Sequence, residues 1–186
     1  MAGNGDGEAD RLDRALSQLE VRLGELGLLR GDGTTIYGLP ALRRVDLGHE
    51  PQALMDADAV QRQLVACAHA VPAASDGLCA SWVELVWSYL GYGLVAGDAT
   101  DIYRDCCHYA DTADLLVGMV VAAAAEPYGM AGRAHGHVGL YAGDRRVMDS
   151  AGGRVRTVPL ELWLSTYGIM CEPRWGWLAG IALDQL

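Results

Sequence analysis

The feature that most constrains the fold is a change in hydrophobic period along the chain. Before Asp114 the apolar residues recur at helical spacing, most clearly over 79–90, where one side carries Trp82, Val83, Val86, Trp87 and Leu90. After Asp114 the period becomes that of strands, over 115–125, 135–142, 145–149, 153–158 and 176–183. Helices followed by a run of strands predict an α+β fold with an antiparallel sheet of about five strands.

The N-terminal part of the chain is predicted to be separate from this domain. Residues 1–9 are rich in Gly and acidic residues and read as a disordered lead. One apolar stripe follows within 10–29, formed by Leu12, Leu16, Leu19, Leu23 and Leu26, and predicts a helix. We therefore expect an extension of helix and loop over 10–50 and the domain over 51–186.

The leucine stripe has two interpretations. A stripe of this kind most often packs against its own domain. The leucines at seven-residue spacing also allow a short contact with a protein partner or a second copy through the 10–29 helix.

Charge and hydropathy exclude several classes of function. The chain has 14 basic and 24 acidic residues, a net charge of -10, and its basic residues are all arginine. No basic run exceeds two residues, which argues against nucleic-acid binding. The apolar stretch 117–125 is too short to span a membrane, and the first ten residues lack the features of a signal peptide. We expect a protein that is cytoplasmic as synthesised, with release by lysis or a non-classical route.

Cys79 is the candidate nucleophile because it falls in the first turn of the helix predicted from residue 79. The free N–H groups and the dipole at a helix start stabilise a thiolate, which is the reactive form of cysteine. The segment 79–90 also follows a turn-like Ser75-Asp76-Gly77, which favours a helix start at this point.

A predicted hairpin supplies the partners of this thiol. Alternation over 135–142 puts His137 and Tyr141 on one face of a strand. A three-residue loop would place His137 directly opposite Asp149, close enough for the carboxylate to hold the imidazole. A two-residue loop would instead shift the register by one and move Asp149 to the other face.

The motifs around these residues resemble those of NlpC-type papain-like cysteine peptidases and the related CHAP amidases. The similar segments are Gly77-Leu-Cys79-Ala-Ser-Trp-Val83 and His137-Val-Gly-Leu-Tyr-Ala-Gly-Asp144, with Asp149 following, and the resemblance extends over 57–183. It implies a papain-like fold in which Cys79 is the nucleophile, His137 the general base and then acid, and Asp149 the orienting residue. It also implies a substrate among the stem or cross-bridge peptides of peptidoglycan.

Other residues complete the predicted site. Tyr141 and His135 share the predicted face of His137, and Ser81 follows Cys79, so we take these three as candidate substrate-binding residues. We expect no metal and no cofactor, because the cysteines show no metal-binding spacing. The remaining cysteines, Cys67, Cys106, Cys107 and Cys171, are interpreted as small core residues.

The sequence therefore predicts a cysteine peptidase or amidase that cleaves an amide bond. Two alternatives remain open. One is a binding or assembly module, with a decayed site, of a phage-tail-like or other cell-wall-associated machine. Two departures from the family pattern favour it: Leu78 stands before the cysteine, and Val117-Gly118-Met119 lacks the acid of the usual Pro-Gly-Asp. The other is a cytoplasmic amidase that acts on a substrate outside the cell wall.

Overall fold

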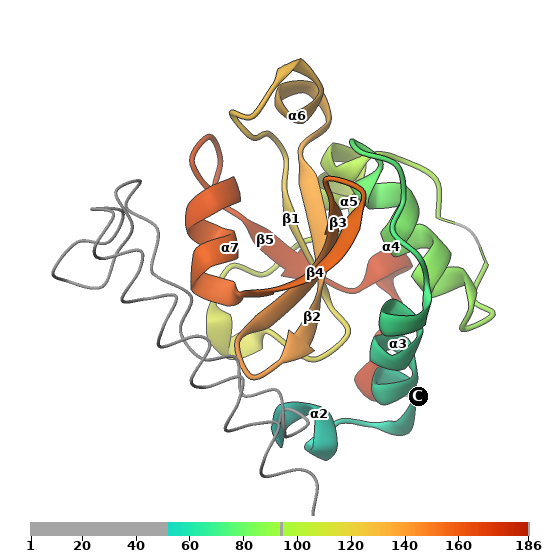
Figure 1. The fold of residues 1–186 in the computed structure, drawn as a ribbon. Coiled ribbons are helices and arrows are strands. Elements are labelled where there is room, and N and C mark those ends of the chain that lie inside the picture. The colour runs from blue at the N-terminus through green and yellow to red at the C-terminus, as the bar shows by residue number, and fades with distance from the viewer. Residues whose placement is uncertain (1–51, 94, 186) are drawn as a thin grey trace, which may run out of the picture. The chain divides into compact units, whose positions relative to one another are not determined.

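A computed structural model describes residues 52–93 and 95–185 of the protein (Figure 1). The predicted disordered lead, the leucine-striped helix and the loop that follows it lie outside the described residues. The boundary predicted at residue 51 also stays a prediction.

Five antiparallel strands form one sheet at the centre of the domain. In chain order they are β1 (Val120–Ala123), β2 (His137–Gly143), β3 (Arg146–Ala151), β4 (Arg154–Pro159) and β5 (Arg174–Gly176). Their spatial order is β4-β3-β2-β1-β5, so the strand that begins with His137 lies in the middle. The predicted α+β fold with an antiparallel sheet of about five strands is confirmed.

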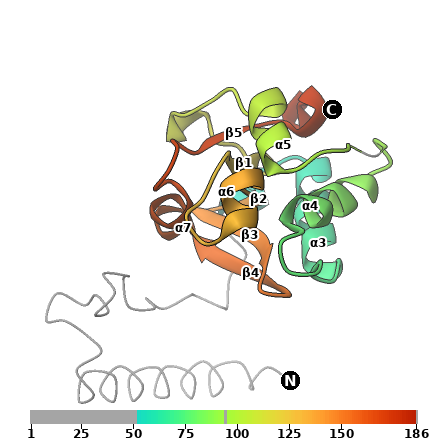
Figure 2. The ribbon, with the colours of Figure 1, turned by 90° about the horizontal axis from the view of Figure 1, so that it is seen from above.

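Helices lie on both sides of these strands, with α3 and α4 on one side and α7 on the other (Figures 1 and 2). The first four described helices precede the sheet, as the hydrophobic period predicts: α2 (Gln52–Asp56), α3 (Ala59–Ala70), α4 (Cys79–Ser88) and α5 (Ala99–Cys106). Two further helices, α6 (Met130–His135) and α7 (Leu160–Tyr167), interrupt the run of strands. Short 3-10 turns lie at Thr112–Asp114, Leu178–Gly180 and Leu183–Gln185.

Helix α4 is held against the sheet by its apolar side. Trp82, Val83, Val86 and Trp87 are fully buried, while Leu85 on the opposite side is exposed. The indole N–H of Trp82 donates to the carbonyl of Val71, which ties the helix to the end of α3. Burial of this side fixes α4 over β2 and β3, the two strands that carry the predicted His137 and Asp149.

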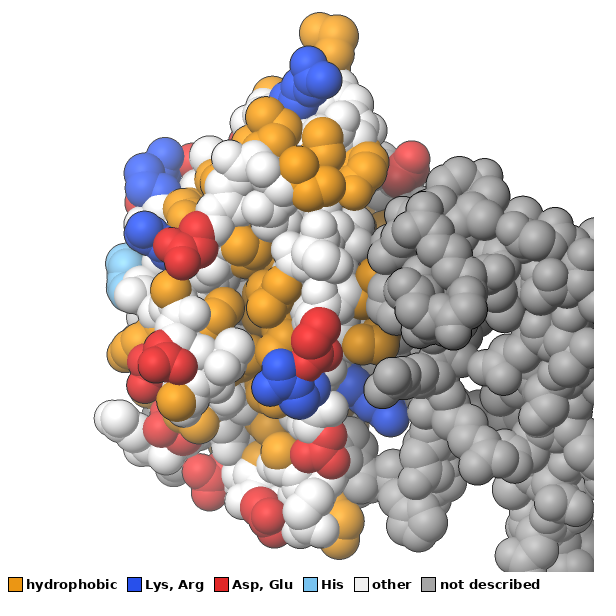
Figure 3. Space-filling view, turned by 90° about the vertical axis from the view of Figure 1, so that its left-hand side faces the viewer, with side chains coloured by type: hydrophobic (Ala, Val, Ile, Leu, Met, Phe, Trp, Pro, Cys, Tyr) orange, Lys and Arg blue, Asp and Glu red, His pale blue; other side chains and the backbone are white. Residues whose placement is uncertain are grey.

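Helix α7 was not predicted, although its sequence contains the signals of a helix. Pro159 precedes it, Glu161 lies in its first turn, and Leu160, Trp163 and Tyr167 form one buried side at helical spacing. The N–H of Leu160 donates to the carbonyl of Arg145, and Arg145 is ion-paired with Glu161. The face that carries α7 shows acidic and basic side chains next to one another (Figure 3). These contacts fix the start of α7 beside the β2–β3 turn.

Three predicted strands are shorter than their hydrophobic runs. The run 115–125 contains only β1, because Gly118 adopts a left-handed φ of 90° and the chain turns there before the strand begins. The run 176–183 is mostly irregular, and β5 ends at Gly176. The run 135–142 begins two residues late, since His135 ends α6. A continuous apolar run marks burial, and burial does not distinguish a strand from a packed turn.

Within the described residues, no helix combines the length and apolar character needed to cross a membrane. All five cysteines are free thiols.

Gly136, which connects α6 to β2, is expected to be essential for the position of His137. Its φ is +69°, and a Cβ at this site would collide with the carbonyl oxygen of Ala123. We expect Gly136→Ala to lower the free energy of unfolding by roughly 2–4 kcal/mol, measured by urea denaturation. Gly152→Ala is the matched control, because Gly152 has a similar φ of +57° but open space around it, and should cost about 1 kcal/mol. Equal losses in the two variants would contradict the steric argument.

Candidate active site

Cys79 is the first residue of α4 and is 7% exposed. The segment that leads into it is fixed to the end of β3 by two hydrogen bonds. Ser150 Oγ accepts from the N–H of Ala74 at 3.1 Å, and Asp76 Oδ1 accepts from the N–H of Gly152 at 3.1 Å. The thiol is therefore placed beside the sheet by contacts on the chain just before it.

His137 is the first residue of β2, and its side chain is 8% exposed. Its Nε2 lies 2.9 Å from Oδ2 of Asp149, and the thiol of Cys79 lies near enough to the imidazole to help raise its pKa. Since Nε2 is occupied by Asp149, Nδ1 is the nitrogen left for the thiol. The structure thus brings the three predicted catalytic residues together.

The strand register that achieves this differs from the predicted one. Asp149 is paired directly with Gly139, two residues along β2 from His137, so the His137–Asp149 contact is diagonal. The turn is the two-residue one, Asp144-Arg145, both with positive φ. A bulge between Tyr141 and Gly143 changes the register by one residue. The net shift from the predicted register is two residues, so Asp149 remains on the face of His137.

Asp149 is completely buried and accepts four hydrogen bonds. Besides His137, Arg156 donates through Nε to Oδ1 at 2.9 Å and through Nη2 to Oδ2 at 2.7 Å, and Trp163 Nε1 donates to Oδ2 at 3.1 Å. Burial works to raise the pKa of Asp149, but the hydrogen bonds from His137 and Arg156 outweigh it and hold the pKa below its usual value. An ionised carboxylate only accepts, so Nε2 of His137 carries a proton that points at Asp149.

Two aromatic side chains of α7 pack on the imidazole. The ring of Tyr167 stacks on His137 with a centroid distance of 4.0 Å and an interplanar angle of 18°. The indole of Trp163 lies against both rings, 4.8 Å from that of Tyr167 and 5.9 Å from that of His137. These rings exclude water from one face of His137.

The environment of His137 favours its protonated form. Burial lowers the pKa of the imidazole, but hydrogen bonds to Asp149 and Cys79 raise it more strongly, to about 9. A nearby thiol and an imidazole that holds a proton at neutral pH are the components of a thiolate–imidazolium pair.

A cavity of about 350 Å³ opens over Cys79 and His137. Two carboxylates, Asp76 and Glu126, belong to its lining. Burial raises the pKa of Glu126, and the charge of His137 partly opposes this rise. Other lining residues include Tyr128, His135, Ser150, Thr166 and Tyr167.

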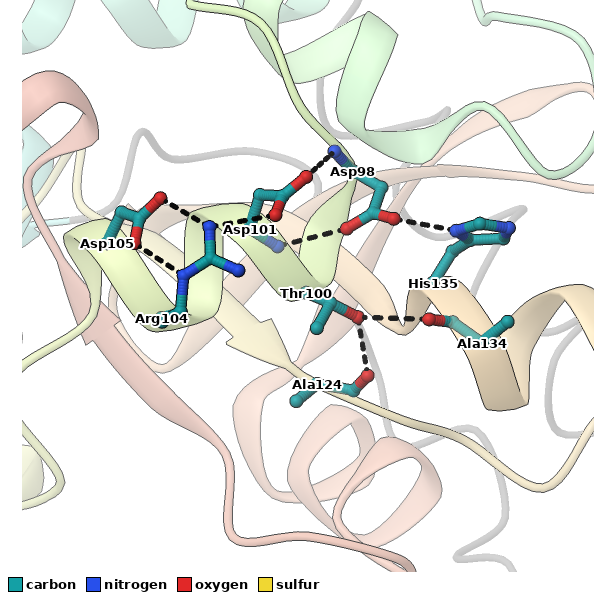
Figure 4. Close-up of polar contacts among 8 residues, drawn as sticks. All are labelled: Asp98, Thr100, Asp101, Arg104, Asp105, Ala124, Ala134 and His135. Carbon is teal, nitrogen blue, oxygen red and sulfur yellow. Dashed lines mark hydrogen bonds and ion pairs between the residues drawn. The ribbon is translucent and has the colours of Figure 1, made fainter.

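His135 lines this cavity, but it is the last residue of α6 and not part of the strand predicted over 135–142. Its Nδ1 lies 2.6 Å from Oδ2 of Asp98, the residue that caps α5 (Figure 4). Thr100 of α5 donates to the carbonyl of Ala124 at 2.7 Å (Figure 4). The connection between β1 and β2, which forms one wall of the cavity, is therefore anchored to the start of α5.

Tyr141 and Ser81 lie elsewhere. The hydroxyl of Tyr141 accepts from the N–H of Arg145 at 3.1 Å, within its own hairpin. Ser81 is on the exposed side of α4. Neither is among the described residues that line the cavity. A role for either in substrate binding stays a prediction.

Three residues of the site were not identified from the sequence: Arg156, Trp163 and Tyr167. Arg156 is directly paired with Asp149 across β3 and β4, so the correct hairpin register would have found it. The other two follow from recognition of α7, whose buried side they form. Their contribution depends on packing between elements that the sequence places far from Cys79.

No metal centre is apparent in the part of the chain that the structure describes. Among residues 52–93 and 95–185, no three His, Cys, Asp or Glu side chains are grouped so that they could hold a metal ion.

The solved structures that are similar to this chain include an NlpC/P60 family protein and a peptidoglycan hydrolase. No family model matches the chain, and no curated protein matches it. The chain is similar to an NlpC/P60 family protein from Bacillus cereus, with 19% identity and a TM-score of 0.46 over 64% of this chain and 40% of that one. It is also similar to the peptidoglycan hydrolase RipB from Mycobacterium tuberculosis, with 16% identity and a TM-score of 0.45 over 94% and 85%. The chain therefore spans less than half of the first protein.

His137 should titrate well above the usual histidine range. By NMR of the imidazole we expect an apparent pKa of about 9 in the wild type and a lower value in Asp149→Asn, which removes the negative partner. Asp98→Asn is the control, because Asp98 is paired with His135 and its loss should leave His137 unchanged. A wild-type value near 6.5 would contradict the geometry.

The raised pKa of His137 also predicts how the free energy of unfolding depends on pH. The pKa of His137 is higher in the folded protein, about 9, than the value of 6.5 for an unperturbed histidine. The protonated imidazole therefore stabilises the folded state fully below pH 6.5, and this stabilisation, roughly 3 kcal/mol, is lost as pH rises through about 9. Urea denaturation from pH 6 to 10 should show a loss that is absent in His137→Gln.

Proposed function

We propose that this protein is a cysteine hydrolase that cleaves an amide bond through a thioester intermediate. The observation that carries the proposal is the contact of Cys79 with an imidazole whose other nitrogen is held by a buried carboxylate. A buried charge of this kind is costly unless it is paired, and a packing role alone does not require it. The cavity in front of the thiol gives a substrate access to it.

The residues take these roles in the proposed reaction. The proton of the Cys79 thiol passes to His137, which forms the thiolate–imidazolium pair, and the sulfur of this pair attacks the carbonyl carbon of the scissile amide. The oxyanion is held by N–H groups at the start of α4, where Cys79, as first residue, has no helical partner for its own N–H. His137 then protonates the leaving amine, and the C–N bond breaks. His137 then takes a proton from a water molecule, whose oxygen attacks the carbonyl carbon of the thioester. The C–S bond breaks, the carboxylic acid product leaves, and the proton on His137 restores the resting pair with Cys79.

The proposed substrate is a peptide of peptidoglycan, and support for this class comes from the resemblance of the sequence motifs to NlpC-type peptidases. The assembled pair favours an enzyme over the decayed assembly module. An amidase that acts outside the cell wall would use the same residues and is distinguished only by its substrate.

The test begins with cysteine reactivity. We expect iodoacetamide to alkylate Cys79 fastest, although Cys67 and Cys171 are more exposed, and we expect this lead to disappear in His137→Ala. Mass spectrometry of each cysteine over a pH series provides the measurement. If rates follow exposure alone, the site is not assembled and the module interpretation gains support.

Turnover should depend on the same residues. With peptidoglycan fragments as substrate, Cys79→Ala should fold as the wild type and show no release of new amino groups. We expect Asp149→Asn to lower kcat by roughly 10⁴-fold, less than His137→Ala, because the imidazole remains present. Equal turnover in the wild type and Cys79→Ala would exclude a cysteine enzyme.

The carboxylates of the cavity favour a substrate with a positive charge. Asp76 already accepts a hydrogen bond from Gly152, so Glu126 is the better candidate to bind an amine. We expect Glu126→Gln to raise KM about fivefold for a peptide with a free amine, as for a charge pair worth about 1 kcal/mol. The KM of Glu126→Gln for the N-acetylated peptide should equal that of the wild type. The control variant Asp114→Asn, whose side chain lies outside the cavity lining, should have the wild-type KM for both peptides. An equal effect on both peptides would argue against an amine contact.

A further inference from the structure

Four side chains near the thiol form a closed set of contacts, which we call the four-residue cluster. His137 contacts Asp149 at 2.9 Å, Asp149 contacts Arg156 at 2.7 and 2.9 Å, and Arg156 Nη2 donates to the hydroxyl of Tyr167 at 2.8 Å. Tyr167 closes the set by stacking on His137 at 4.0 Å. Arg156 is the member of this set that touches both neighbours of the imidazole.

The sheet register places Arg156 for this role. It is the direct partner of Asp149 on the neighbouring strand, so its side chain extends along the same face. A guanidinium has a fixed fork of donors and can bond both oxygens of a carboxylate while a further N–H reaches a third group. Lysine would keep the charge but lacks this fork.

The charges around His137 come from several elements. Asp149 of β3 and Cys79 of α4 contact it directly, Glu126 of the β1–α6 connection acts on it through space, and Arg156 of β4 lies behind Asp149. Asp76 acts on Glu126. Tyr167 of α7 stays neutral, because burial and then Asp149 raise its pKa to about 12. Arg156 is thus the cation that shares Asp149 with the imidazole.

We propose that Arg156 is a positioning residue that fixes the imidazole of His137 in two directions, its edge through Asp149 and its face through Tyr167. The catalytic consequence rests on the proposed cysteine hydrolase. The electrostatic consequence does not, since it concerns only the charges in the folded protein.

Removal of Arg156 should change both properties. Without the guanidinium, the whole charge of Asp149 acts on His137, so the pKa of His137 should rise above its wild-type value in Arg156→Gln. This direction is opposite to that expected for Asp149→Asn. A misplaced imidazole should lower kcat roughly 10- to 100-fold and leave KM unchanged, because Arg156 does not line the cavity.

Three variants test the proposal, with turnover of peptidoglycan fragments and NMR of His137 as readouts. Arg156→Gln should show both effects. Arg156→Lys should retain a His137 pKa near that of the wild type, because the positive charge remains. Its kcat should fall nearly as far as that of Arg156→Gln, because lysine lacks the fork of donors. Arg154→Gln is the matched control, since Arg154 lies on β4 two residues before Arg156 and outside the four-residue cluster. This variant should behave as the wild type.

The outcomes separate this proposal from the proposed function. If the wild type shows no turnover, the function fails while the NMR measurement still tests Arg156. A folded Arg156→Gln protein whose His137 pKa equals or lies below the wild-type value would overturn the proposal. If Arg156→Gln does not fold, Arg156→Lys decides, and a wild-type kcat in that variant would overturn the positioning role.

Discussion

The rest of the site depends on one buried charge, the carboxylate of Asp149. It is inaccessible to water, yet four hydrogen bonds, two of them from the guanidinium of Arg156, keep it ionised. Because it is ionised, it sets the tautomer of His137, directs Nδ1 toward the thiol and raises the pKa of the imidazole. Each of these properties would be lost if Asp149 were neutral or displaced. The packing of β3, β4 and α7 around this carboxylate is therefore a condition for the chemistry that we propose at Cys79.

The thiol depends on a second set of constraints, those that fix the start of α4. The buried side of the helix, with Trp82 and Trp87, holds it against the sheet. Two hydrogen bonds, from the N–H of Ala74 to Ser150 Oγ and from the N–H of Gly152 to Asp76 Oδ1, hold the chain ahead of Cys79. Both sets meet at β3, which carries Asp149 and Ser150 in consecutive positions. One strand therefore aligns the proposed nucleophile, Cys79, with the residue that orients its proposed base.

Much of the fold was predictable because its signals are local. The helical period over 79–90 and the alternation over 135–142 follow from burial of one side of each element, and both elements are present in the structure. The elements that were missed or misplaced depend on short-range geometry with weak sequence signals. Gly136, with its positive φ, is the single residue between the end of α6 and the start of β2. Helix α7 follows β4 without a loop. A hydrophobic pattern does not resolve such boundaries.

The sequence by itself determined which residues could do the chemistry: a cysteine at a helix start, a histidine on a strand, and an aspartate on the returning strand. It also determined that the last two belong to one hairpin. Only the tertiary structure decided how they meet. A two-residue turn alone would have turned Asp149 away, and the bulge at 141–143 returned it to the face of His137. The structure also decided that Arg156, Trp163 and Tyr167 surround the pair. The physical reason is that side-chain direction in a strand reverses with every one-residue shift, and the shift itself is set by turn and bulge geometry that packing selects.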